Sequence, residues 1–286
     1  MFLFKRKSKK TDCRNAHSKH RCWTLSGTAI CDVGVLRGNN EDNFILGKQI
    51  NENCSNLCET TIENVDIPWF FAGVFDGMGG GEKGEIAALT AAQVFRDVSA
   101  HLSKDVTDFD VVNALRTAFL DSNNQIVDMQ DTRIYGTTGT VLAIGTTSCK
   151  VFHLGDSRAY LYRDDQLFPL TRDQTLSQIK IDTGLYLPND PQIEADKHKL
   201  TEYIGKDRTK KHLRPVESEW ISIENRDILL LCSDGLYDMC SDQNLLEILR
   251  QNSTIQVKAK KLIRAALEAG GHDNVTCILL EFSENS

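Results

Sequence analysis

The sequence predicts an α+β fold, a four-layer α-β-β-α sandwich of two antiparallel sheets flanked by helices. Strand-like segments occur in groups, and they do not alternate one by one with helical segments. This order argues against a doubly wound parallel sheet, whereas two sheets packed face to face with helices outside accommodate it well. Because we find no internal repeat and no strong linker, residues 23–286 are expected to form a single domain.

The first strands are expected over residues 28–36 and 43–46. A polar segment, residues 48–66, interrupts the pattern and reads as a long loop or a hairpin tip. Residues 69–75 form a continuous apolar run, which is typical of a buried strand. That run ends at Asp76, and the glycines directly after it predict a sharp turn.

Two long helices are predicted next. From Ile86 to Leu102, apolar or small residues recur at every fourth position, which places them on one face of a helix. Residues 108–129 carry a second apolar stripe of the same kind. Both stripes are interpreted as core packing.

The middle of the chain is predicted to consist mainly of strands, over residues 141–146, 150–154 and 158–162. Asp164-Asp165 reads as the tip of a hairpin that leads into the next apolar residues.

A short helix is expected over residues 175–183, closed by Gly184. The following residues, 185–209, are polar, interrupted by proline and without clear periodicity, so they are predicted to form a mobile flap.

The last third of the chain begins with two segments, residues 220–223 and 227–232, that are expected to pair as strands. Ser241 and Ser253 are predicted to cap two helices, the second of which ends before Gly270. Residues 274–282 form the last predicted strand.

Composition limits the possible functions. The chain has 286 residues, of which 41% are hydrophobic and 26% charged, as in ordinary soluble proteins. The net charge of -7 argues against non-specific nucleic-acid binding. The nine cysteines are expected to be reduced, and no stretch is long and apolar enough to span a membrane. We therefore expect a cytoplasmic monomer that binds no nucleic acid and does not insert stably into a membrane.

Residues 1–22 read as a basic, flexible arm. The arm lacks the apolar core of a signal peptide. A weak attraction to an anionic membrane surface is the alternative, but a few lysines alone would not make it stable.

Four acidic motifs carry the chemistry. Three of their aspartates, Asp76, Asp234 and Asp273, stand at an end of an apolar run, and rigid strand ends can hold carboxylates together. A single Asp-Gly is usually a turn, but oxygen donors grouped in this way favour hard cations such as magnesium or manganese. The motifs are Arg37-Gly38-Asn39-Asn40-Glu41-Asp42, Asp76-Gly77-Met78-Gly79-Gly80, Ser233-Asp234-Gly235 and His272-Asp273-Asn274.

These motifs predict a metal-dependent hydrolase of phosphoesters. Asp76 could bridge two ions about 3.5–4 Å apart, an arrangement that activates water for in-line attack on phosphorus. Gly77 has no side chain, so its carbonyl can approach an ion closely. Arg37 can offer a bidentate fork to the phosphate oxygens.

The motifs, taken in order, closely resemble those of the metal-dependent (type 2C) protein serine/threonine phosphatases of bacteria. The resemblance covers nearly the whole predicted domain. It rests on Arg37-Gly38-Asn39-Asn40-Glu41-Asp42, Val74-Phe75-Asp76-Gly77-Met78-Gly79-Gly80, Gly136-Thr137-Thr138, His153-Leu154-Gly155-Asp156-Ser157-Arg158-Ala159-Tyr160-Leu161, Asp173-Gln174-Thr175, Leu231-Cys232-Ser233-Asp234-Gly235-Leu236 and Gly271-His272-Asp273-Asn274-Val275-Thr276.

The resemblance implies a role for each site residue. Asp76 would bridge two Mn²⁺ or Mg²⁺ ions, and the Gly77 carbonyl would bind one of them. Asp234 and Asp273 would complete the other. The remaining roles fall to Glu41, which would hold a metal through water, Asp42, which would orient the attacking water, and Arg37, which would bind phosphate.

The resemblance also implies scaffold roles for Asp156, His153 and Thr138. Its implied substrates are phosphorylated proteins, the targets of a serine/threonine kinase.

The chain departs from the family pattern at three places. Met78 replaces a histidine that many eukaryotic members have, and methionine cannot donate a proton. Arg133 stands where many members have an aspartate for a third metal, so a third ion of the usual kind is doubtful, although Asp131 could substitute if the loop is shifted. The segment 199–205 matches the flap sequence of the family only in part, which leaves the choice of substrate open.

Two other functions remain possible at this point. A catalytically weak relative that binds phosphoproteins would be expected to lack metal-binding aspartates, but Asp76, Asp234 and Asp273 are all present. A metallohydrolase of small phosphoesters differs from a protein phosphatase, on the sequence, only by the family resemblance.

Overall fold

Two antiparallel sheets form the centre of the protein. The computed structural model describes residues 23–66, 68–79, 82–103, 105–187, 190–207 and 213–284, so the predicted basic arm, residues 1–22, lies outside them. One sheet has the strand order β3-β1-β13-β12-β8-β9. The other has the order β10-β7-β6-β4-β2, with β11 beside β7 and β5 beside β4.

The strands are β1 Trp23–Asp32, β2 Asp42–Leu46, β3 Leu57–Asp66, β4 Phe70–Met78, β5 Gly136–Thr137, β6 Gly139–Ile144, β7 Ser148–Leu154, β8 Arg158–Arg163, β9 Gln166–Pro169, β10 Val216–Glu217, β11 Ile221–Ser222, β12 Ile228–Cys232 and β13 Val275–Glu284. The helices are α1 Glu82–His101, α2 Asp108–Met129, α3 Leu176–Asp182, α4 Ile193–Asp196, α5 Asp234–Tyr237, α6 Asp242–Leu249 and α7 Ile255–Glu268.

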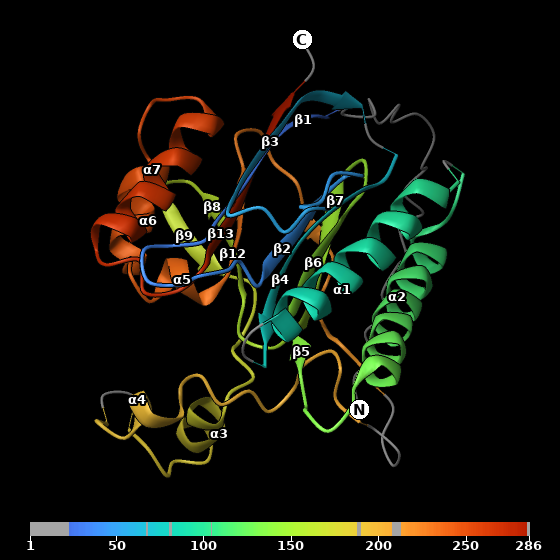
Figure 1. Ribbon diagram of the computed structural model, residues 1–286. Helices are drawn as coiled ribbons and strands as arrows, with labels where there is room; N and C mark the ends of the chain where they lie inside the picture. The colour runs from blue at the N-terminus through green and yellow to red at the C-terminus, as the bar shows by residue number, and fades with distance from the viewer. Residues whose placement is uncertain are drawn as a thin grey trace, which may run out of the picture.

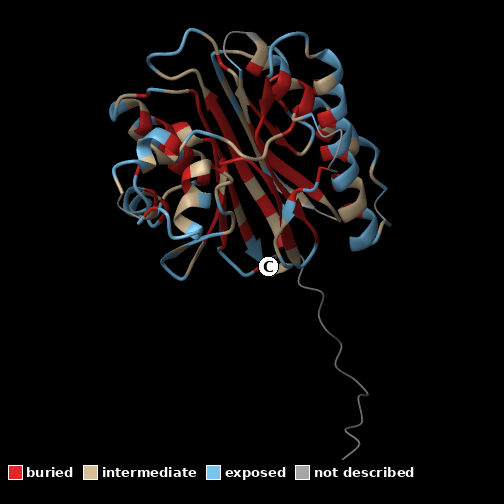
Figure 2. Cartoon of the chain, turned by 90° about the horizontal axis from the view of Figure 1, so that it is seen from below, coloured by how far each residue is buried: buried red, intermediate tan, exposed pale blue. Residues whose placement is uncertain are grey.

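The layers follow the predicted order. Side chains such as Phe44 and Leu142 from one sheet and Leu25 and Leu231 from the other form a core between the sheets. A second apolar cluster joins α1 and α2 to the β4 sheet, and a third joins α5, α6 and α7 to the β12 sheet. Figure 1 shows these helices on opposite sides of the two sheets. The four-layer sandwich is therefore confirmed, and Figure 2 shows buried residues concentrated in its strands.

Helix ends follow local capping chemistry. At the start of α2, Thr107 and Asp110 form a reciprocal capping box, and Ser241 and Asn244 do the same for α6. The predicted cap of α7 is wrong by one residue, because the Thr254 side chain, rather than that of Ser253, accepts from the helix backbone.

The predicted hairpin tip is confirmed between β8 and β9. Asp164 and Asp165 both have positive φ, 50° and 59°. A two-residue turn with both residues in this region matches the twist of antiparallel strands.

Two strand predictions are wrong. Part of the presumed loop 48–66 is strand β3, which pairs with β1 from Asp32↔Leu57 to Thr24↔Asp66. Strand β3 lies at the edge of its sheet, where polar residues are tolerated. This polar composition is the reason why the segment was interpreted as a loop. The segments 220–223 and 227–232 do not pair with each other, because β11 joins β7 while β12 lies between β13 and β8 in the other sheet.

Residues 190–207 of the predicted flap contain α4, and the mobility of the flap stays a prediction. The seven cysteines of the described residues are free, as expected. Within the described ranges, no helix combines the length and the apolar character needed to cross a membrane.

His153, on β7, should make the fold sensitive to acid. The ring is buried, with Nδ1 2.9 Å from the Thr140 hydroxyl and Nε2 3.1 Å from the Arg172 carbonyl oxygen. Burial lowers the pKa of His153 to about 4, against roughly 6.5 in an unfolded chain. Between these values the unfolded chain binds a proton that the folded chain does not, so stability falls as the pH drops below about 6.5.

We expect this residue to cost about 2 kcal/mol of unfolding free energy between pH 7.5 and pH 5. Urea unfolding at both pH values should show that the loss is smaller by this amount in His153→Gln. An equal pH dependence in the two proteins would contradict the assignment.

Candidate metal centre

The four acidic motifs meet at one end of the sandwich. In one sheet, Asp42 at the start of β2 pairs with Asp76 near the end of β4. In the other sheet, the end of β12 pairs with the start of β13, at Cys232↔Cys277. Asp234 lies two residues after the end of β12 and Asp273 lies two residues before the start of β13, so both sheets deliver carboxylates to the same place.

A cavity of about 430 Å³ lies at this end of the sandwich. Six of the seven predicted site residues line it, and Asp42 does not. Its lining comprises Arg37, Glu41, Asp76, Gly77, Met78, Gly79, Thr138, Asp156, His198, Leu200, Asp234, Asp273 and Asn274.

Asp42 lies buried behind the cavity, where it connects the two sheets. Its Oδ2 accepts hydrogen bonds from the Ser233 and Thr276 hydroxyls, both at 2.7 Å. Burial raises the pKa of Asp42 to about 7, although these two hydrogen bonds oppose the shift. Among the described residues no donor contacts Oδ1, so this oxygen is the one left for the predicted contact with water.

Negative charge accumulates around Asp76. Its carboxylate faces the cavity but is otherwise enclosed by protein, and this burial, followed by the charge of Asp42, raises its pKa well above the usual range. Burial and then the charge of Asp234 raise the pKa of Asp156 and of Asp273. Crowded carboxylates of this kind are stabilised by cations.

The donor set fits hard divalent cations. Carboxylates from Asp76, Asp234 and Asp273 face one cavity together with the backbone of Gly77. Oxygen ligands of this kind suit Mg²⁺ and Mn²⁺. The cavity thus has both the charge and the atoms that the predicted ions need.

Arg37 stands at the rim of this cavity with a half-exposed side chain. Its Nη2 lies 2.6 Å from Oδ2 of Asp273. The Asn274 side chain fixes the loop on which Arg37 and Glu41 lie, because its Oδ1 accepts from the Glu41 N–H and its Nδ2 donates to the Val33 and Asn39 carbonyls.

Glu41 reaches the first turn of α1. A Cβ atom at Gly84 would lie only 2.2 Å from Oε2 of Glu41, so glycine is needed for this approach. The N-terminal end of a helix favours a carboxylate, which helps to hold Glu41 at the cavity.

Two ionisable residues of the cavity lining, Asp156 and His198, were not among the predicted site residues. Asp156, for which the resemblance implies a scaffold role, lines the cavity with only 4% of its surface exposed. Like Asp76, it follows an apolar strand, and this signal could have identified it. His198 comes from the flap segment, which has no periodic pattern, and its Nδ1 lies 3.2 Å from Oδ2 of Asp234.

Thr138 and Met78 also line the cavity. The Thr138 hydroxyl accepts from the Asp76 N–H at 2.9 Å and so helps to position that residue. Asp131, the possible third-metal ligand, is not part of the cavity lining. Its exposed carboxylate lies 3.7 Å from Nζ of Lys83.

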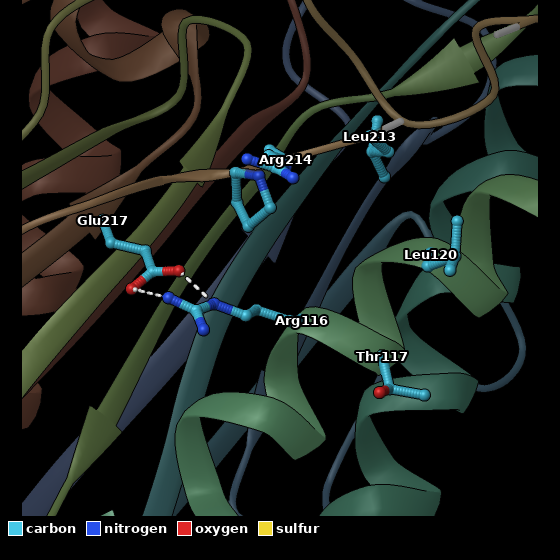
Figure 3. A pocket seen from close by; sticks show the side chains of 7 residues that line it. Arg116, Thr117, Leu120, Leu213, Arg214 and Glu217 are labelled. Carbon is cyan, nitrogen blue, oxygen red and sulfur yellow. Dashed lines mark hydrogen bonds and ion pairs between the residues drawn. The ribbon is translucent and has the colours of Figure 1, made fainter. Parts of the chain in front are cut away.

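A second cavity, of about 530 Å³, lies between α2 and β10 (Figure 3). Its acidic side chain, Glu217, is engaged by Arg116 at 2.6 and 3.1 Å. With its carboxylate neutralised in this way, the lining of this cavity offers no comparable cation site.

Known proteins are similar to this chain in sequence and in fold. The description of the family Protein phosphatase 2C matches residues 28–180 and 212–275. The serine/threonine protein phosphatase PstP of Mycobacterium tuberculosis is 32% identical over 261 residues, which cover 90% of this chain and 45% of that protein. The protein phosphatase PhpP of Streptococcus pneumoniae is 31% identical over 262 residues, covering 89% of this chain and 96% of that protein.

Solved structures agree with the sequence comparison. The catalytic domain of PstP, solved in complex with two manganese ions, superposes with a TM-score of 0.71 at 28% identity, covering 92% of this chain and all of that domain. The chain thus spans about half the length of the mycobacterial protein, and this part includes its catalytic domain.

Proposed function

The chain belongs to the protein phosphatase 2C family, and we propose that it is a metal-dependent phosphatase of phosphoserine and phosphothreonine in proteins. The observation that carries this proposal is the meeting of Asp76, Asp234 and Asp273 in one cavity with Arg37 at its rim. A relative that only binds phosphoproteins would not need this complete set of carboxylates.

Each residue has a place in the proposed reaction. Asp76 would lie between two Mn²⁺ or Mg²⁺ ions, with the Gly77 carbonyl on one, Asp234 and Asp273 on the other, and Glu41 acting through water. When bound, such ions lower the pKa of water and offset the charge of the phosphoryl group. Asp42 would orient the water.

The reaction adds water to phosphorus and breaks the bond to the serine or threonine oxygen. Arg37 would hold the phosphate oxygens, for which its planar fork is suited. The leaving oxygen needs a proton, and Met78 at the cavity wall cannot provide one. Solvent water or a neighbouring side chain must therefore supply it.

Hydrolysis of a phosphothreonine peptide with Mn²⁺ tests the function. Chelator should abolish turnover, and excess Mn²⁺ should restore it. Turnover that survives the chelator would overturn the mechanism. A much higher kcat/KM for a small phosphoester than for any phosphopeptide would instead favour a small-molecule hydrolase.

Arg37→Ala should mainly raise KM. Hydrogen bonds to charged groups contribute about 1.5–3 kcal/mol, so kcat/KM should fall roughly 10- to 100-fold. Steady-state kinetics at saturating Mn²⁺ would measure the effect.

Arg116→Ala is a matched control, because Arg116 also pairs with a carboxylate and its side chain is 51% exposed, as is that of Arg37. It should leave KM unchanged. An unchanged KM in Arg37→Ala would remove this residue from the phosphate site.

Three narrower expectations stay predictions. They are a serine/threonine kinase as the enzyme that makes the substrates, a monomeric state and a cytoplasmic location.

A further inference from the structure

Two exposed apolar side chains stand directly before Arg37 in the chain. Val35 is 61% exposed and Leu36 is 69% exposed. Single exposed apolar residues are common on protein surfaces and need no explanation. These two are adjacent, however, and the next residue is the one at which the proposed function places the phosphate. A peptide bound there would pass close to the Val35–Leu36 pair.

Hydrogen bonds hold the loop that carries this pair. The Val35 N–H donates to the Gly271 carbonyl at 2.8 Å. After the pair, the Asn274 side chain donates to the Asn39 carbonyl at 3.0 Å and accepts from the Glu41 N–H at 2.8 Å. The two apolar side chains therefore project from a fixed loop, so little conformational freedom should be lost when a peptide binds against them.

The turn at Gly34 brings the loop against the metal centre. Gly34 has a φ of 79°, and an added Cβ would lie only 2.1 Å from the carbonyl oxygen of Asp273. Arg37 reaches Oδ2 of the same aspartate, at 2.6 Å. The Val35–Leu36 pair lies between these two contacts along the chain, so it is kept beside the mouth of the metal cavity.

Another cavity, of about 410 Å³, continues the metal cavity past Arg37. The two cavities share the lining residues Arg37, His198, Asp234 and Asp273. The wall of the added cavity includes His272, which directly follows the residue that accepts from the Val35 N–H. A peptide whose phosphate lies at Arg37 can therefore extend into this cavity with the Val35–Leu36 pair beside it.

Charge in the added cavity offers a peptide little selectivity. Nζ of Lys197 lies 3.0 Å from Oε1 of Glu194 and 3.1 Å from Oδ2 of Asp238. The two carboxylates that have no place in the proposed metal centre are thus already paired with a lysine. Burial of apolar surface, which needs no charged partner, is then the main source of selectivity at this edge of the site.

We propose that the Val35–Leu36 pair selects phosphoprotein substrates that carry a large apolar residue, such as leucine or phenylalanine, near the phosphorylated one. Three extended residues span about 10 Å, which is enough to pass from a phosphate at the Arg37 guanidinium to the backbone of the same loop. The inference rests on the proposed function, because it concerns the substrates of the same site.

A panel of phosphothreonine peptides tests the proposal. The peptides differ only by Leu or Asn at one position, from three residues before the phosphothreonine to three after it. At one position or more, Leu should raise kcat/KM about 10-fold, mainly through a lower KM, because apolar burial stabilises the bound peptide before and during the reaction alike. This preference should be largely lost in the double variant Val35→Asn, Leu36→Asn.

Two controls separate selectivity from damage to the site. Para-nitrophenyl phosphate carries no peptide, so the double variant should hydrolyse it as fast as the unchanged protein. Phe109→Asn is the matched surface variant, since Phe109 is 70% exposed but lies in the first turn of α2, outside both cavities. It should keep the full preference for Leu.

Equal kcat/KM for the Leu and Asn peptides at every position would overturn the proposal, as would an undiminished preference in the double variant. Failure of the proposed function gives a different result, because the unchanged protein would then hydrolyse no phosphopeptide with Mn²⁺. Hydrolysis of all the peptides without an apolar preference would refute this inference and leave the proposed function standing.

Discussion

Replacing Asp76 with Asn should lower kcat for a phosphothreonine peptide by about 10³-fold or more. Metal-dependent stabilisation of the transition state is worth several kcal/mol, and each 1.36 kcal/mol changes a rate tenfold. In the proposed function Asp76 is the carboxylate that would touch both ions, so its loss should disturb the whole centre. Stopped assays at saturating Mn²⁺ would measure the rate.

The same substitution should make the metal-free protein more stable. Burial and the charges of Asp42 and Asp234 raise the pKa of Asp76 well above its usual range. At any pH above the ordinary carboxyl pKa of about 4, the unfolded chain is ionised. The folded chain must then either keep a proton on Asp76 or hold a crowded charge, so this carboxyl destabilises the fold and a neutral amide removes the cost. Thermal unfolding in chelator at pH 8 should give a higher Tm for Asp76→Asn than for the unchanged protein.

Added Mn²⁺ should reverse that order, because a ligand stabilises only the state that binds it. Asp131→Asn is the control, since this exposed carboxylate lies outside the cavity, and it should change neither kcat nor Tm appreciably. An unchanged kcat in Asp76→Asn would contradict the proposal that Asp76 bridges the two ions. If Asp76→Asn had a lower Tm in chelator than the unchanged protein, the crowded carboxylates would not be destabilising the metal-free fold.

The sequence could predict those residues of the metal centre that lie at the ends of buried strands. Asp76, Asp234 and Asp273 each stand at one end of a buried apolar run, and such runs are visible in sequence. Their convergence follows once both sheets are known to place these ends together. The resemblance to a known family supplied the separate roles of Arg37 and Glu41.

The parts that were missed depend on contacts that no local pattern encodes. His198 reaches Asp234 because the flap pairs with residues 174–176, and its own segment has no periodicity. Strand β3 was hidden because only one of its edges is paired, so its composition is polar. Strands β11 and β12 were assigned to each other because sequence proximity cannot show that the chain changes sheets between them.

Gly235→Ala should destabilise the fold and slow the reaction. Gly235 is the second residue of α5, and an added Cβ would lie 2.0 Å from the carbonyl oxygen of Asn274. The contacted oxygen belongs to the backbone and cannot rotate away as a side chain could. Helix α5 must therefore move away from the start of β13. Overpacking of this kind costs about 1–3 kcal/mol, which urea unfolding would measure.

The movement should also separate Asp234 from Asp273, because these residues lie on the two segments that are pushed apart. A misplacement of about 1 Å can cost roughly 100-fold in rate, so kcat should fall even where the variant is fully folded.

Gly38→Ala is the matched control, since an added Cβ there meets no atom within 4 Å, and its unfolding free energy should change by less than about 0.5 kcal/mol. Equal stability of the two variants would show that α5 can shift without cost. If Gly235→Ala then kept its full kcat, the spacing of Asp234 and Asp273 would not limit the reaction.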